Sequence, residues 1–396
     1  MKKVFCLFIV FVLTLCSGCV SALEPPPRVI ELQTEYDGSV LDLCGSSLRE
    51  YLSEDDFAAQ CNFLVEHEDE HYDWQNIMLI WKDCGCEEYT VSISLDGDFT
   101  QPYTYVTESC EFYYGMFKPG VTYYWKVEGA GGCSSQTDSF TVSEQPVAIY
   151  TIDGAPNFRD SGGWMTESGR RERYGMLYRG SQLNGYGDAE PIPESGKSKL
   201  REDLKIKSEI DLRTQDVDDG GQDSNFFAPG EAYVKAPFHP YTHIIPEYRK
   251  EDPDRVFDER VPESIATIFE FLSNEENYPV YYHCNAGADR TGTLAFLING
   301  VLGVSYEDLT RDFEITSFMG MGNRWRGSEE SGFTDGVMSD TYTDTYVAWG
   351  KMYELMLTYY SDDEDGSLSA AIENYLVTAC GVEQAHIDAL RDIMLE

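Results

Sequence analysis

A cysteine and an arginine stand six positions apart in the stretch PVYYHCNAGADRTGT, residues 279–293. Cys284 ends an apolar run of β-forming residues, and Arg290 opens a segment with a helical pattern. A glycine-containing loop between a strand and a helix points backbone N–H groups into one concavity, which favours a bound anion. Arg290 is able to hold two phosphate oxygens, and the same positive field lowers the pKa of the Cys284 thiol. The spacing therefore predicts a thiolate that attacks a cradled phosphate through a phosphocysteine intermediate, with no metal required.

The elements that would position this loop lie between residues 147 and 396, where strands and helices alternate. This order predicts an α/β domain with a mainly parallel sheet and helices on both faces. The expected strands span 207–214, 231–238 and 279–284, and the expected helices span 262–274, 291–303, 305–315, 346–360, 368–380 and 383–395.

The pattern His-Cys-x5-Arg-Thr at a strand-to-helix junction is the signature of the cysteine-dependent protein tyrosine phosphatase superfamily, which residues 283–291 resemble. APNFRDSGG (155–163) followed by LYRGS (177–181) is similar to the opening of the bacterial atypical tyrosine/dual-specificity phosphatases, and IDLRT (210–214) is similar to one of their strands. The resemblance covers residues 147–396. It implies an enzyme that hydrolyses phosphate monoesters without a metal or another cofactor.

In that family the aspartate before the arginine is proposed as the general acid, and Asp289 holds this position here. A carboxylic acid beside the leaving oxygen protonates it, and the resulting carboxylate then activates water. The alternative acid lies in the run DVDD (216–219), which would leave Asp289 to organise the loop. The expected catalytic residues are Cys284, Asp289 and Arg290, and the expected phosphate-binding residues are Asn285, Ala286, Gly287, Ala288 and Arg290.

Flanking residues are expected to support the loop. His283 is expected to hydrogen-bond to it and favour the thiolate, and Thr291 to donate its hydroxyl to Cys284. The residues expected to form ion pairs that position the loop are Arg159, Asp160, Arg179 and Arg213.

The substrate class follows from Ala288, which replaces a lysine that the family associates with the second phosphate of phosphoinositides. Its absence, with a net charge of −41, favours phosphotyrosine or another singly phosphorylated substrate, dual specificity included. Two alternatives stay open. One is an inositol-polyphosphate or phosphoinositide phosphatase of the same chemistry, and the other is an inactive surface binding protein.

Short alternating strands with turn residues between them fill residues 76–142. Trp81 and the run FKPGVTYYWKV (117–127) resemble the second-strand tryptophan and the L-x-P-G-T-x-Y-x-W-x-V signature of fibronectin type III domains. The resemblance implies a two-domain chain in which an all-β sandwich over 73–145 precedes the α/β domain. The sandwich is expected to be a spacer or a module that binds an unknown partner.

In a sandwich of that type, four cysteines would meet at one end: Cys84, Cys86, Cys110 and Cys133. Two disulfides are the preferred expectation, and a four-thiolate zinc site is the alternative. The remaining cysteines of the mature chain are a candidate pair around an expected helix over 54–65, Cys44 and Cys61, and two expected free thiols, Cys284 and Cys380.

Residues 1–22 have the layout of a signal peptide: two lysines, an apolar stretch and small residues. The run CSGC that ends at Cys19 also resembles a bacterial lipoprotein processing site, so we expect an exported protein at the cell surface, anchored through a lipid on Cys19. Residues 23–72 are expected to be a linker and an acidic segment. The chain holds 29 Lys and Arg against 70 Asp and Glu. This balance argues against nucleic acid and anionic membrane surfaces as partners.

Two histidine patterns are not expected to bind a metal. His239 and His243 lack a carboxylate partner at helical spacing, and HEDEH (67–71) matches a zinc-protease motif inside a short acidic run. Residues 320–344 are long for a loop within a compact domain, so they are expected to be a lid over the site or disordered. Their arginines, Arg324 and Arg326, are candidates for recruiting an anionic substrate.

Overall fold

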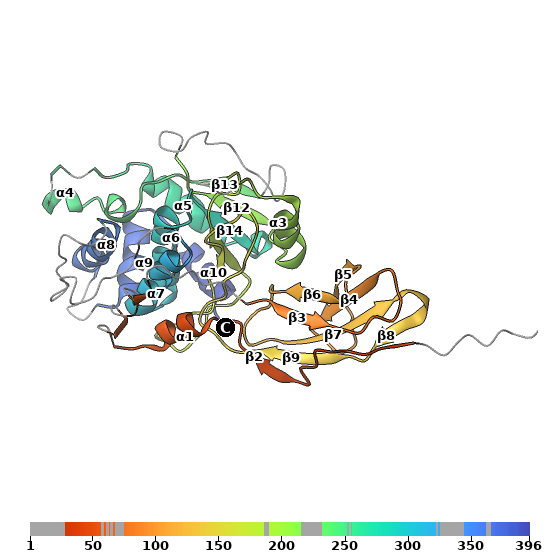
Figure 1. Ribbon diagram of the computed structural model, residues 1–396. Helices are drawn as coiled ribbons and strands as arrows, with labels where there is room; N and C mark the ends of the chain where they lie inside the picture. The colour runs from red at the N-terminus through yellow and green to blue at the C-terminus, as the bar shows by residue number, and fades with distance from the viewer. Residues whose placement is uncertain are drawn as a thin grey trace, which may run out of the picture.

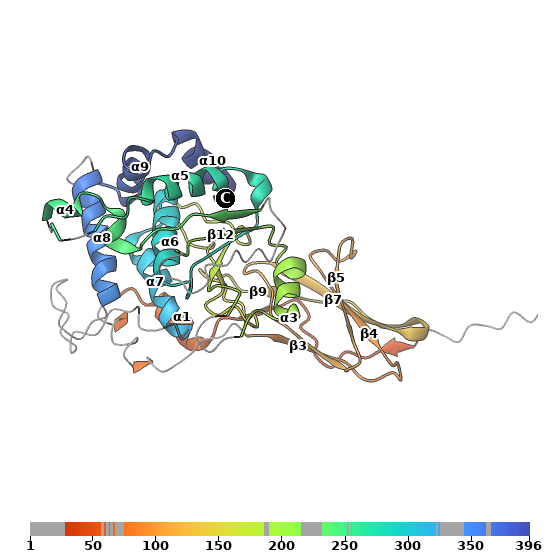
Figure 2. The same cartoon turned by 90° about the horizontal axis from the view of Figure 1, so that it is seen from above.

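The computed structural model contains a strand-rich N-terminal region beside a C-terminal domain in which helices surround a sheet (Figure 1). Figure 2 shows the same two parts side by side from above. Within the described part of the chain, each helix is too short or too polar to cross a membrane. The structure describes residues 28–56, 59–60, 63, 66–67, 75–185, 190–214, 232–251, 253–254, 256–321, 324, 344–361 and 366–396.

The strands of the N-terminal region form two sheets. The larger has the order β1-β8-β7-β4-β5, with β9 paired to β7 and β2 paired to β9, and the smaller pairs β3 with β6. Side chains of β7 alternate with the period of two that a half-buried strand requires, so that Tyr123, Trp125 and Val127 are buried. The strands are β1 (Val29–Ile30), β2 (Ser39–Leu41), β3 (Ile77–Ile80), β4 (Tyr89–Ser94), β5 (Tyr103–Thr107), β6 (Glu111–Tyr114), β7 (Thr122–Gly129), β8 (Cys133–Ser135) and β9 (Asp138–Val142), with the short helix η1 (Ala130–Gly132) before β8.

The prediction of short strands over 76–142 is confirmed, with one difference at 104–116. This stretch is two strands, because residues 108–110 turn the chain out of the large sheet and into the small one. β5 pairs with β4, and β6 pairs with β3. Trp81, directly after β3, packs edge-on against Tyr89 of β4 at 5.5 Å between ring centroids. This contact joins the two sheets.

The predicted disulfides are not found among the cysteines that the structure describes. Cys84, Cys86 and Cys133 are thiols whose sulfur atoms all lie within 4.8 Å of one another. Cys110 does not join them, since it lies at the turn between β5 and β6, where the chain changes sheets. The expectation that four cysteines meet is therefore corrected to three. Cys61, the expected partner of Cys44, lies outside the described residues.

The sheet of the C-terminal domain has five strands in the order β10-β11-β14-β12-β13. β11, β14, β12 and β13 are parallel, whereas β10 runs antiparallel to β11. The sheet, expected to be mainly parallel, is thus mixed, with one antiparallel strand at its edge. No helix intervenes between β10 and β11 in the fully described stretch 161–176, so the chain reverses instead of making a crossover. The strands are β10 (Arg159–Asp160), β11 (Leu177–Gly180), β12 (Ser208–Asp211), β13 (Tyr233–Lys235) and β14 (Val280–His283).

Helix α6 follows β14 and forms the centre of the helical layer. It is buried almost all round from Thr291 to Leu302 and packs against α7, α9 and β14, as expected of a core helix. The α-helices are α3 (Glu194–Ser198), α4 (Tyr248–Glu251), α5 (Val261–Leu272), α6 (Asp289–Leu302), α7 (Tyr306–Phe318), α8 (Asp344–Tyr360), α9 (Leu368–Thr378) and α10 (Gln384–Met394), and the short helices are η2 (Lys199–Asp203), η3 (Tyr241–Ile244) and η4 (Glu275–Asn277).

Helix α1 (Ser46–Ser53) precedes the main strands in sequence but docks on α7 of the C-terminal domain (Figure 1). The Tyr51 hydroxyl donates to the buried carboxylate of Glu314, and the Tyr51 ring packs on Phe318 with 5.3 Å between centroids. Arg311 donates to the Glu54 carbonyl over 2.8 Å. The stretch expected to be linker and acidic segment therefore covers part of α7. Of the expected helix over 54–65, residues 59–60 and 63 are helical and residues 54–56 are not, whereas the other six positions lie outside the described residues.

Replacement of Tyr51 by Phe should destabilise the chain by about 1–3 kcal/mol, because it removes a donor from a buried carboxylate while keeping the ring. Urea unfolding of the full chain measures this change. Tyr36→Phe is the matched control, since the Tyr36 hydroxyl donates to the Met78 carbonyl at an exposed position. Equal losses for both variants would contradict a specific role for the α1–α7 contact.

Candidate active site

Cys284 lies at the carboxyl end of β14, the middle strand of the sheet, and the loop after it leads into α6. The thiol is buried, with only 2% of the residue exposed. The loop makes its tightest approach at Gly287, whose φ is +68°. A Cβ at this position would stand 2.3 Å from the backbone of Gly180 on β11. Only glycine fits there, so the sequence builds a loop pressed against the neighbouring strand.

The carbonyl oxygens of this loop are turned away from its concave side by donors around it. The Asn157 side chain donates to the carbonyls of both Ala286 and Gly287 over 3.0 Å, and Arg179 donates to the Gly287 carbonyl over 3.0 Å. The backbone of Gln182 donates to the Asn285 carbonyl over 2.9 Å. In a trans peptide the N–H points opposite to the C=O, so the next amides face inward. The loop is thereby a ready cradle for an anion.

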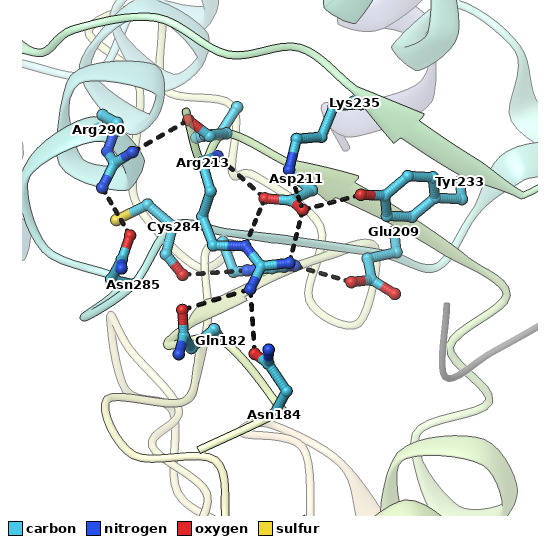
Figure 3. Close-up of polar contacts among 12 residues, drawn as sticks. Gln182, Asn184, Glu209, Asp211, Arg213, Tyr233, Lys235, Cys284, Asn285 and Arg290 are labelled. Carbon is cyan, nitrogen blue, oxygen red and sulfur yellow. Dashed lines mark hydrogen bonds and ion pairs between the residues drawn. The ribbon is translucent and has the colours of Figure 1, made fainter. Parts of the chain in front are cut away.

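Arg290 opens α6 beside Cys284 (Figure 3). Its guanidinium donates to the side-chain oxygen of Asn285 over 2.6 Å and to the Leu212 carbonyl over 3.5 Å. Both acceptors are neutral, and a phosphate oxygen binds a guanidinium more strongly than either. The geometry leaves Arg290 able to exchange the Asn285 contact for an anion.

The pKa of the Cys284 thiol is lowered, although burial alone would raise it. The charge of Arg290 and the Thr291 hydroxyl favour the thiolate, and together they outweigh the burial and the nearby charge of Asp289. The Thr291 hydroxyl is buried and has no other hydrogen-bond partner in the described part of the chain. The surroundings of Cys284 therefore favour its thiolate form.

His283 supports the loop from below. One ring nitrogen, Nδ1, lies 3.0 Å from the Cys284 carbonyl, and Nε2 lies 2.8 Å from the Glu209 carboxylate. Burial lowers the pKa of His283, but the Glu209 hydrogen bond and the charge of Asp211 outweigh it and raise the pKa overall. A protonated ring donates from both nitrogens, which matches two acceptor partners.

A buried ion-pair network beneath the loop joins three parts of the chain. The carboxylate of Asp312 on α7 accepts from Arg159 of β10 over 3.0 Å and from Arg179 of β11. Arg159 also donates to the side-chain oxygen of Asn157, which fixes the amide that holds the loop. Burial and the neighbouring charge of Arg179 lower the pKa of Arg159 to about 10, so the Arg159 guanidinium stays charged at neutral pH. The pair of arginines is therefore compensated by one acid that lies far along the chain.

Of the residues expected to form ion pairs, Arg213 does so, whereas Asp160 accepts hydrogen bonds from backbone amides. Arg213 forms an ion pair with Asp211 at 2.7 Å and also donates to Gln182 and Asn184 (Figure 3). Asp160 forms no ion pair with another described residue. Its carboxylate accepts instead from the backbone amides of Gly162 and Gly175, and burial raises its pKa to about 6. Its contribution is to the chain reversal between β10 and β11.

Asp289, the first residue of α6, is held by two side chains from distant segments. The Tyr241 hydroxyl donates to Asp289 Oδ1 over 2.6 Å. Arg324 binds both oxygens, with Nε 3.1 Å from Oδ1 and Nη2 2.9 Å from Oδ2. The Asp289 side chain remains 31% exposed, so it is reachable from solvent. Arg324, expected to recruit an anionic substrate, thus lies at the site and pairs with the expected acid.

The structure brings together the sequence-predicted residues of 283–291, and it adds several that sequence reasoning missed. Asn157 belongs to the motif NFRD, but its two contacts with the loop carbonyls carry no separate sequence signal. Tyr241 and Asp312 lie in segments without a recognisable motif. The residues added by the structure are Asn157, Gln182, Glu209, Tyr241 and Asp312.

The remaining predictions concern histidines and acidic segments. The rings of His239 and His243 lie 5.6 Å apart, but no described group of three potential metal ligands includes them. His71 and the acidic run 216–219 lie outside the described residues, as does most of 320–344. A general acid from residues 216–219, and a lid formed by residues 320–344, therefore stay predictions.

A cysteine with a lowered pKa that lies beside an arginine, in a tight loop between a strand and a helix, is typical of a cysteine-based phosphatase. Residues 150–396 match the family model described as the tyrosine phosphatase family, and the match spans more than half of the chain. The chain therefore belongs to the tyrosine phosphatase family. No curated protein matches the sequence. Among solved structures, the core catalytic domain of the PP-IP phosphatase SIW14 from S. cerevisiae, in complex with citrate, is 20% identical, with a TM-score of 0.25, over 36% of this chain and 71% of that one.

Gly287→Ala should lower kcat/KM about a hundredfold or more, because the loop must retreat from Gly180 and small misplacements in an active site carry such costs. Gly169→Ala is the matched control: Gly169 also has a positive φ, of +81°, but open space around its Cβ position. The control should show backbone strain and normal turnover. Turnover of any activated aryl phosphate is the measurement, and equal turnover in both variants would contradict the close packing of the loop.

Thr291→Val removes the hydroxyl and keeps the shape of the side chain. The Cys284 pKa lies below its ordinary value, so the thiolate is present above that pKa and is lost as the pH falls through it. Loss of the hydroxyl should raise this pKa and move the acidic limb of Cys284 alkylation by iodoacetamide to higher pH. An unchanged limb would show that Arg290 and the loop amides suffice without Thr291.

Proposed function

We propose that this phosphatase is a metal-independent enzyme for singly phosphorylated substrates, with phosphotyrosine as the preferred class and dual specificity within its reach. The observation that carries the proposal is the place of Cys284, whose pKa is lowered, at the start of a loop whose Asn285, Ala286 and Gly287 carbonyls accept from donors outside the loop. A buried thiolate placed in this way is matched to a phosphorus atom, because the amides and Arg290 stabilise the equatorial oxygens during transfer.

The reaction takes two displacement steps. In the first, the Cys284 sulfur forms a bond to phosphorus while the bond to the leaving oxygen breaks, and Asp289 gives its proton to that oxygen. In the second, water attacks phosphorus, Asp289 takes a proton from the water, and the sulfur–phosphorus bond breaks to restore the thiolate. Arg290 exchanges its contact with Asn285 for phosphate oxygens throughout.

Tyr241 and Arg324 support the assignment of Asp289 as acid and base. Both side chains fix the direction of its carboxylate, which stays 31% exposed. The proton that Asp289 gives to the leaving oxygen in the first step leaves the carboxylate that takes a proton from water in the second.

The preference for one phosphate rests on the charges around the loop. The cations near it are already compensated by acids: Lys235 pairs with Asp211 at 2.9 Å, and Arg324 pairs with Asp289. Ala288 offers no charge where the family lysine would stand. A substrate with several phosphates, such as an inositol polyphosphate, would find Arg213, Lys235 and Arg324 already paired with acids.

For the N-terminal region we propose a fibronectin type III-like sandwich over 73–145. The Tyr123 hydroxyl accepts from the Lys118 backbone amide over 2.9 Å, a return contact found at the tyrosine corner of such sandwiches. We also propose that the chain is exported through residues 1–22 and held at the cell surface by a lipid on Cys19. The sandwich then serves as a spacer or as a module for a surface partner.

Asp289→Asn should lower kcat by about 10²–10⁴-fold for an alkyl or phenyl phosphate, and much less for an aryl phosphate with a weakly basic leaving group, because only the former needs the proton. Cys284→Ser should abolish turnover of both substrates, in the presence or absence of a chelator. Asp388→Asn, on an exposed face of α10, is the control.

A uniform loss on both substrates would assign Asp289 a structural role and return the acid to 216–219. Faster hydrolysis of phytate than of a phosphotyrosine peptide would replace the proposed substrate class with inositol polyphosphates. Full activity of Cys284→Ser would contradict the mechanism itself.

A further inference from the structure

Three cysteine thiols converge in the N-terminal region, outside the phosphatase site. Cys84 and Cys86 lie in the turn between β3 and β4, and Cys133 begins β8. The sulfurs of Cys84 and Cys86 are 3.3 Å apart, well beyond the S–S bond of about 2.05 Å. All three sulfurs lie within 4.8 Å of one another. Cys133 is buried, whereas the other two are partly exposed, so the cluster has one open side.

Glycines build this cluster. Gly85 has a φ of +78°, and this left-handed turn aims the two flanking cysteines to one side. Gly129 of β7 is paired with Cys133, and a Cβ on Gly129 would come within 2.7 Å of the Cys86 sulfur. The strand therefore makes room for a sulfur where any other residue would block it. The backbone of two separate turns therefore brings the three cysteines together.

Negative charge surrounds this cluster of thiols. Asp83, Glu87 and Glu88 flank the two cysteines of the turn between β3 and β4. A cation among the sulfurs would be favoured by these neighbouring carboxylates.

We propose that Cys84, Cys86 and Cys133 bind one thiophilic closed-shell cation, Zn²⁺ or Cu⁺, through three thiolates. Zinc bound by sulfur at about 2.3 Å in tetrahedral geometry separates its sulfurs by about 3.8 Å, which the cluster reaches with small shifts. Water on the open side completes four-coordination of Zn²⁺, whereas Cu⁺ is satisfied by the three soft sulfurs. Each ligating thiol releases its proton on binding.

The odd number of thiols favours a metal over a disulfide. A disulfide between any two of the three would leave the third thiol unpaired beside it, where it could attack the bond. Cys110, which would restore an even number, is not a member of the cluster. A metal ion uses all three sulfurs and protects them from oxidation outside the cell.

The test uses the full chain in a Cys284→Ser background, so that the catalytic thiol cannot bind the probe ion. The reduced protein is incubated anaerobically with Zn²⁺, or with Cu⁺ in a parallel sample, and desalted against a weak chelator. About one equivalent of one of these ions should remain bound. Added Cys86→Ser or Cys133→Ser should weaken retention at least about tenfold, whereas added Cys110→Ser, the matched control, should leave it unchanged.

A second measurement needs no added cysteine substitution and does not depend on how well such variants fold. Bound Zn²⁺ or Cu⁺ should slow iodoacetamide labelling of the peptides that carry Cys84, Cys86 and Cys133, while labelling of Cys110 stays at its metal-free rate. The proposal is overturned if neither ion is retained, if Cys110→Ser loses as much metal as Cys86→Ser, or if mass spectrometry of the protein as purified finds a disulfide within the cluster.

Discussion

The loop between Cys284 and Arg290 depends on the ion pairs that Asp312 forms beneath it. The Asp312 carboxylate compensates two buried guanidiniums, those of Arg159 and Arg179, that would otherwise stand uncompensated in the interior. Burying one unpaired charge costs several kcal/mol, so removal of any one of these three side chains would destabilise the other two. Arg179 reaches the Gly287 carbonyl directly, and Arg159 reaches it through Asn157. This ion-pair network beneath the loop therefore sets the direction of the loop carbonyls, and with it the direction of the amides opposite them.

This arrangement explains how a chain with a net charge of −41 builds an anion site. The global field repels phosphate, so the attraction must come from groups within a few ångströms. Inward amides, the start of α6 and Arg290 supply it, and their effect is large because the site is buried. The neighbouring cations Arg213, Lys235 and Arg324 are paired with acids, which keeps them from competing for the phosphate. The same local field lowers the pKa of the Cys284 thiol.

The loop and its immediate flanks could be predicted from sequence, because their chemistry depends on residues close together in the chain. The strand β14, the helix α6, and the spacing of Cys284 and Arg290 are all of this kind. Contacts such as Asp312 with Arg159, or Tyr241 and Arg324 with Asp289, join segments 35 to 153 positions apart and leave no local pattern. The antiparallel β10 was missed because its two residues are too short for any periodicity. The grouping of four cysteines was wrong for Cys110 because a strand that changes sheets looks continuous in sequence.

Helix α1 places the start of the folded catalytic unit far upstream of where similarity to the family begins. The family match starts at residue 150, yet Tyr51 closes over Phe318 and Glu314 on the helix that carries Asp312. A recombinant fragment cut at the family boundary would present an aromatic ring and a carboxylate to solvent on the outer face of that helix. A fragment chosen by similarity alone would therefore lack helix α1, which packs against the catalytic domain.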